Sequence, residues 1–187
     1  MPVTAVDPAT ALIVIDLQQG IVSRELAHPV EPVVTRAATL AQAFRDRDLP
    51  VVLVNVAGTP PGRTDAGATA SGDLPADWAT LIPELDRQPG DILVTKYARS
   101  AFAGTGLADR LRADGVTQVV VIGIATGAGV ESTARDAHEQ GFHVTLPVDA
   151  MTDSDSERHE HSIAHIFGRI AETGTTDDVL RLLAARA

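Results

Sequence analysis

The chain of 187 residues contains no cysteine, which excludes disulfide bonds, cysteine-ligated metals and catalysis by a thiol. Aromatic residues are scarce at 3%, so the core must be built from Val, Leu, Ile and Ala. The 15 Lys and Arg residues are outnumbered by 25 Asp and Glu residues. The resulting net charge of −10 argues against general nucleic-acid binding, which needs clusters of cations to neutralise phosphates.

Long hydrophobic runs are missing as well. No apolar stretch approaches the roughly 18–20 residues that span a membrane, and the N-terminus lacks a basic-then-apolar signal segment. We therefore expect a cytoplasmic protein that does not bind a membrane. The length is most simply that of one domain, residues 1–187, and the hydrophobic content of 44% is ordinary for a globular protein.

Short apolar runs alternate with helical patterns along the chain. Apolar runs predict buried strands at residues 11–17, 51–56, 91–95, 117–122, 143–148 and, more weakly, 171–174. Helical spacing of apolar residues lies between them, at residues 33–44, 105–113, 127–140 and 163–170, with a short helix near Trp78 and a closing helix capped by Thr176. This alternation predicts an α/β fold, a parallel sheet between two layers of helices.

One connection is unusually long. Residues 57–77 hold four glycines and three prolines and show no helical or strand pattern. Long loops within compact domains are usually functional, so we interpret this one as a loop over the site or at a subunit contact.

The chain is organised around residues 119–137. An apolar run ends at Gly123, and the small residues at 127–129 then begin a helical segment. A strand, a tight turn and a helix N-terminus direct backbone N–H groups and the positive end of a helix dipole at one place. Glycines let a substrate approach the backbone closely. A small anionic or polarised group would suit that place.

The same stretch carries a family resemblance. Residues 123–137, Gly-Ile-Ala-Thr-Gly-Ala-Gly-Val-Glu-Ser-Thr-Ala-Arg-Asp-Ala, resemble the signature of the isochorismatase-like hydrolases, which include nicotinamidases and other cysteine hydrolases. The resemblance spans nearly the whole chain and implies a Rossmann-like α/β/α fold with six parallel strands in the order 3-2-1-4-5-6. It also implies a non-proline cis peptide at Ile124–Ala125, which would turn the N–H groups of Ala125 and Gly129 into an oxyanion hole.

Three candidate catalytic positions end or follow predicted strands: Asp16, Lys96 and Gly129. Ligands in open α/β sheets bind beyond the carboxyl ends of the strands, so the three should converge in one crevice. The resembled family uses the matching Asp, Lys and Cys as its catalytic triad, and Gly129 stands at the position of the cysteine. The alternative is that Asp16 caps a loop and Lys96 is an ordinary strand-end charge.

Four further residues are candidates for substrate contact. Arg99 could hold a substrate carboxylate through two hydrogen bonds, or could be a plain surface arginine. Asn55 lies near the end of the second predicted strand and could point into the site. The resemblance adds Phe102, from a Ser-Ala-Phe segment at the family's spacing, and Thr126, which follows the expected cis peptide.

Without a thiol, acid–base chemistry by Asp16 is what this site can offer. The isochorismatases proper also carry glycine at this position, and the resemblance implies an aspartate that protonates a vinyl ether before water attacks. Lys96 should lower the pKa of Asp16 and burial should raise it, and a general acid near neutral pH needs burial to dominate. The alternatives are a catalytically silent member that only binds its ligand and an engineered Cys-to-Gly variant.

No metal and no other cofactor are expected. His161 and His165 have the i, i+4 spacing of a helical zinc pair, but the HExxH order is absent and a solvated helix face is favoured. Nicotinamidase-type relatives take a metal from an aspartate and histidines after the second strand, where this chain has Asn55 and small residues. The expected partners are a small-molecule substrate and further copies of the chain, since the resemblance implies a homo-oligomer.

Overall fold

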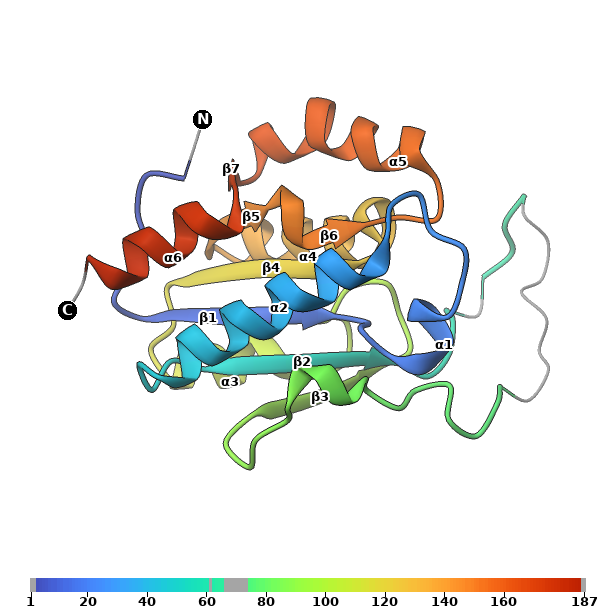
Figure 1. Ribbon diagram of the computed structural model, residues 1–187, viewed down its shortest axis with the longest axis horizontal. Coiled ribbons are helices and arrows are strands. Elements are labelled where there is room, and N and C mark those ends of the chain that lie inside the picture. Colours follow the sequence, from blue (N-terminus) through green and yellow to red (C-terminus); the bar gives the residue numbers. More distant parts are fainter. Residues whose placement is uncertain (1–2, 61, 66–73, 186–187) are drawn as a thin grey trace.

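A parallel β-sheet forms the centre of the molecule (Figure 1). The computed structural model describes residues 3–60, 62–65 and 74–185. In this part of the chain, seven strands pair in the order β3-β2-β1-β4-β5-β7, and β6 pairs separately with β4. The strands are β1 (Thr10–Ile15), β2 (Val51–Val56), β3 (Ile92–Lys96), β4 (Gln118–Ile124), β5 (His143–Pro147), β6 (Met151–Thr152) and β7 (Glu172–Gly174).

The predicted α/β class and strand order are confirmed. All pairings are parallel, and the last predicted strand corresponds to β7 beside β5. The prediction missed β6, which pairs with the last two residues of β4, Gly123 and Ile124. A strand of two residues is too short for an alternating or apolar pattern to reveal it.

Helices cover both faces of the sheet. The α-helices are α1 (Gln19–Val22), α2 (Val30–Arg45), α3 (Leu107–Ala113), α4 (Glu131–Glu139), α5 (Ser156–His161) and α6 (Thr176–Ala184). Short 3-10 or π segments are η1 (Pro83–Leu85), η2 (Thr126–Val130), η3 (Val148–Ala150), η4 (Ser162–Ile166) and η5 (Phe167–Arg169). None of the helices in the described residues is both long enough and apolar enough to cross a membrane.

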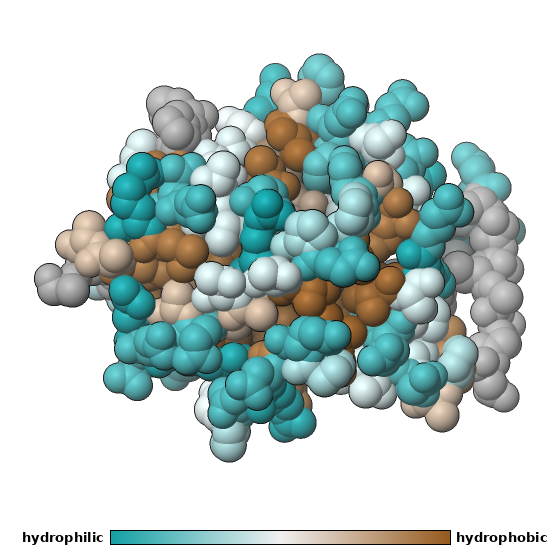
Figure 2. All heavy atoms as spheres, viewed as in Figure 1, coloured by the Kyte–Doolittle hydropathy of each residue, from teal (hydrophilic) through white to brown (hydrophobic). Residues whose placement is uncertain are grey.

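Each face of the sheet has its own hydrophobic core. The core beneath α2 and α6 contains Phe44 and Leu183, and the core beneath α3 and α4 contains Leu111 and Phe167. Strand β1 is buried along its whole length because it lies at the middle of the sheet between these cores. Figure 2 shows that the outer surface over α2 and α6 carries mostly hydrophilic side chains with hydrophobic ones between them.

Two predicted helix details were wrong. The N-cap of α6 is Thr175, whose hydroxyl accepts a hydrogen bond from the Asp178 N–H at 3.2 Å, and Thr176 is the first helical residue. The carboxylate of Asp178 accepts the Thr175 N–H in return, at 3.0 Å, which completes a capping box. The short helix predicted near Trp78 is instead a turn, followed by the three-residue η1.

Candidate active site

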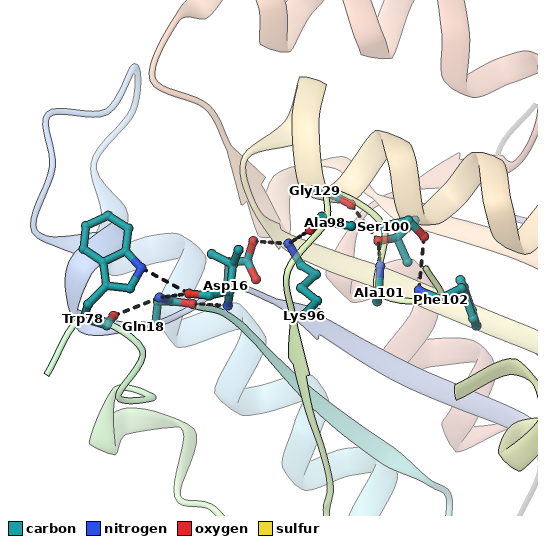
Figure 3. A network of polar contacts seen from close by, with 11 residues as sticks. Asp16, Gln18, Trp78, Lys96, Ala98, Ser100, Ala101, Phe102 and Gly129 are labelled. Atoms are coloured by element: carbon teal, nitrogen blue, oxygen red, sulfur yellow. Dashed lines mark hydrogen bonds and ion pairs between the residues drawn. The ribbon is translucent and has the colours of Figure 1, made fainter. Parts of the chain in front are cut away.

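Asp16 and Lys96 meet at the carboxyl edge of the sheet (Figure 3). Asp16 follows β1 with a φ of +52°, in the left-handed region, so the chain turns sharply as the strand ends. Lys96 is the last residue of β3, on the far side of β2, and its Nζ lies 2.8 Å from Asp16 Oδ2. Their side chains are 7% and 2% exposed. The Lys96 ammonium also donates to the carbonyl of Ala98 at 3.2 Å.

Burial has the largest effect on the pKa of Asp16. Removal of the carboxyl group from water raises its pKa from 3.8 to about 6, although the charge of Lys96 and its hydrogen bond act in the opposite direction. The second oxygen, Oδ1, is buried and has no hydrogen-bond partner among the described residues. The carboxyl therefore has one oxygen held by an ammonium and another that is available to carry a proton.

Gly129 lies directly beside this carboxyl. It belongs to η2, which follows the cis peptide bond between Ile124 and Ala125. A Cβ added at Gly129 would lie 3.2 Å from Asp16 Oδ2 and 2.8 Å from Cγ2 of Ile15. A side chain at position 129 would thus face the acid, and Ile15 would have to move to admit it.

Two local features hold these segments in place. Thr133 on α4 donates from its hydroxyl to the Gly129 carbonyl at 2.7 Å and accepts the Ala101 N–H at 3.0 Å, which ties the segment after β3 to η2. Gly123 has a φ of +116°, and a Cβ there would lie 2.1 Å from the carbonyl oxygen of Ile15. Only glycine allows β4 to approach β1 this closely at the site.

A cavity of about 480 Å³ opens over Asp16. Five of the predicted site residues line it: Asp16, Lys96, Arg99, Ala125 and Gly129. The described part of the long loop also contributes, through residues 58–60, 62 and 64. Residues 61 and 66–73 of that loop lie outside the described residues.

The other three predicted residues are not part of the cavity lining. Asn55 donates from Nδ2 to the Ala79 carbonyl at 2.7 Å, which turns its amide toward the neighbouring loop. Phe102 is 7% exposed, and its ring stacks on Phe142 in the hydrophobic core with centroids 5.9 Å apart. Thr126 is fully buried behind the turn.

Thr126 belongs to a polar network that the sequence analysis did not anticipate. Its hydroxyl lies 2.8 Å from Nδ1 of His159, whose ring is 4.7 Å from that of His28. His28 in turn lies 3.0 Å from the hydroxyl of Thr152 in β6. Burial, and next the nearby His28, lower the pKa of His159. The network therefore connects η2 to His159 of α5 and, through His28, to β6.

Arg24 and Ser154 also line the cavity, and neither was predicted from the sequence. Arg24 follows α1 and has no helical or strand pattern around it to single it out, so only the folded chain identifies it.

His161 and His165, the two histidines with zinc-like spacing, are both exposed, and their ring centroids lie 5.0 Å apart. Among the described residues, no group of three or more His, Asp or Glu side chains is placed to hold a metal ion.

Comparisons with known proteins identify the family of the chain. Residues 10–178, most of the chain, match the family model of the isochorismatase domain. The chain belongs to the isochorismatase family. Its relatives include proteins named as amidohydrolases and as a probable isochorismatase, which places the chain among the hydrolases of this family.

Three similar proteins illustrate the relationship. The uncharacterized isochorismatase family protein YwoC of Bacillus subtilis is 40% identical, over 91% of this chain and 92% of its own length. The corresponding YecD protein of Escherichia coli O157:H7 is 39% identical, over 93% and 96%. The solved structure of an isochorismatase family protein from Burkholderia thailandensis has a TM-score of 0.85 at 36% identity and covers 96% of this chain and 98% of that one.

Proposed function

We propose that this isochorismatase-family chain hydrolyses a small molecule without a cysteine nucleophile, using Asp16 as the general acid and base. The observation that carries the proposal is the environment of the Asp16 carboxyl and its effect on the pKa of that group. It is buried, it lines the cavity, its pKa is about 6, and its Oδ1 has no partner among the described residues. A pKa one unit below neutrality leaves roughly a tenth of the carboxyls protonated at pH 7, so acid and base forms are both populated.

The proposed reaction needs only proton transfer and water. Protonated Asp16 gives its proton to the substrate, for example to the double bond of a vinyl ether, and water then adds to the resulting cationic carbon. The carboxylate takes up the proton that the added water releases, so Asp16 is restored while the adduct separates into two products. Gly129 has no side-chain atom that could act as a nucleophile, so the proposal assigns the chemistry to Asp16 and water.

The neighbouring groups have supporting roles in this proposal. Lys96 holds Oδ2 and so fixes the orientation of the Asp16 carboxyl, which lines the cavity. The backbone N–H groups of Ala125 and Gly129, both in the cavity lining, are proposed to stabilise negative charge that develops on a substrate oxygen. We also propose that the chain forms a homo-oligomer, which light scattering would show as a mass above the 19.6 kDa of one chain.

The test is a panel of vinyl ethers, amides and ureido compounds, assayed with wild type and Asp16→Asn. Loss of general acid–base catalysis is expected to lower kcat by about 10²–10⁴-fold in Asp16→Asn. If Asp16 is the acid, kcat/KM of wild type should fall as the pH rises through about 6. The exposed Asp114→Asn variant has the same charge change and should keep full activity.

Two outcomes would contradict the proposal. Turnover that persists in Asp16→Asn would show that another group carries the chemistry. Binding without turnover of any class in the panel would instead support a silent member that keeps the cavity for its ligand. Amidase activity that appears in Gly129→Cys would favour the further alternative, a chain that has lost a cysteine nucleophile by evolution or by engineering.

A further inference from the structure

The cavity over Asp16 concentrates positive charge in an acidic protein. The chain has a net charge of −10, yet among the described residues that line the cavity Asp16 is the sole acid, against Lys96, Arg24 and Arg99. Asp16 and Lys96 form an ion pair with each other. The two arginines are exposed, and neither has a carboxylate partner among the described residues.

Arg24 is held over the cavity by a fixed aromatic ring. Its guanidinium carbon lies 4.7 Å from the centroid of the Trp78 ring, a cation–π contact. The indole N–H of Trp78 donates to the Val56 carbonyl at 3.1 Å, and the buried Gln18 donates from Nε2 to the Trp78 carbonyl at 2.8 Å. The ring also packs flat on Gly20, where a Cβ would lie 2.2 Å from it.

Arg99 reaches the same cavity from a different part of the chain. It follows β3, whereas Arg24 lies in the loop between α1 and α2. A surface arginine usually lies near an acid or points into solvent. Two arginines from different segments at one cavity instead give that part of the cavity a positive charge. Guanidinium groups bind carboxylates and phosphates through paired, charge-assisted hydrogen bonds.

We propose that this cavity binds a substrate that carries a carboxylate or a similar oxyanion, which Arg24 and Arg99 hold while the reacting group faces Asp16. Trp78 is the positioning residue for Arg24. The inference rests on the proposed function, since it names the substrate class of that site. The binding step itself needs no turnover, and the two proposals can therefore fail separately.

The experiment measures the binding of three probes of matched size by isothermal titration calorimetry: glutarate, its monoamide and its diamide. We expect wild type to bind glutarate most tightly and the uncharged diamide most weakly, with the glutarate affinity falling as salt is added. Arg24→Gln and Arg99→Gln should each weaken glutarate binding by about 10-fold or more, as expected for loss of a charge-assisted hydrogen bond.

Two variants make the test specific. Arg87→Gln removes one positive charge from an exposed residue outside the cavity lining, and it should leave glutarate binding unchanged. Trp78→Leu should lower the ratio of glutarate to diamide affinity, which a general loosening of the fold would not change. Thermal unfolding of each variant shows whether it is folded.

The inference is overturned if the diamide binds as tightly as glutarate, if Arg87→Gln weakens binding as much as the cavity variants, or if glutarate shows no saturable binding at millimolar concentrations. Asp16-dependent hydrolysis with a preference for uncharged compounds would overturn the substrate class and leave the proposed function intact. Glutarate binding that depends on the two arginines, without turnover of any compound in the panel, would overturn the proposed function and leave the ligand class intact.

Discussion

Replacement of Asp16 by asparagine should change how stability depends on pH, independently of any substrate. The folded-state pKa of this carboxyl is about 6, compared with 3.8 for an aspartate in water. The folded protein therefore binds this proton more tightly than the unfolded chain does. The stabilisation from the protonated carboxyl is fully present below about pH 3.8 and is lost as the pH rises through about 6.

The size of the effect follows from the shift of about two pKa units. At 1.36 kcal/mol per unit, the full difference in the free energy of unfolding is about 3 kcal/mol. About 2 kcal/mol of it should be seen between roughly pH 4.5 and 7.5, because part of the titration lies below that window. Asparagine cannot titrate, so the stability of wild type relative to Asp16→Asn should decrease by this amount as the pH increases.

Urea unfolding of both proteins at several pH values measures this difference. The Asp114→Asn variant controls for the loss of one negative charge at an exposed position. A difference between wild type and Asp16→Asn that stays constant over the window would show that burial does not dominate at Asp16. If the stability of wild type relative to Asp16→Asn increased with pH, the charge of Lys96 would outweigh burial and keep the carboxylate ionised. Either result would remove the basis for a general acid at this position.

Two further predictions concern the scaffold. Gly123→Ala should destabilise the protein by more than about 3 kcal/mol or prevent folding, because its Cβ would lie 2.1 Å from the Ile15 carbonyl. Gly104→Ala, also at positive φ but with open space around it, should lose only about 1–2 kcal/mol by urea unfolding, and equal losses would refute the steric argument. Gln18→Leu should lose about 2–5 kcal/mol, because the buried Gln18 amide accepts the Val56 N–H and donates to the Val56 and Trp78 carbonyls. Gln42→Leu, which removes an exposed hydrogen bond, should lose much less, and a similar loss would argue against this role of Gln18.

The sequence by itself predicted the architecture and the position of the candidate site. The longer strands and helices leave local periodic patterns, so their alternation could be predicted, and β2 was predicted with its observed bounds. A charged residue that ends an apolar run is conspicuous, which is how Asp16 and Lys96 were found. The absence of cysteine, which excludes a thiol nucleophile, is likewise a property of the sequence alone.

Tertiary structure decided which of these residues meet and in what environment. Asp16 and Lys96 are 80 residues apart, and their contact depends on the order in which β1, β2 and β3 pair. The balance between burial and the charge of Lys96 depends on how completely the folded chain excludes water, which no local pattern encodes. The stacking of Arg24 on Trp78 likewise joins distant segments through packing. Periodicity reports short-range structure, whereas the protonation and charge of the cavity arise from contacts between residues far apart in the chain.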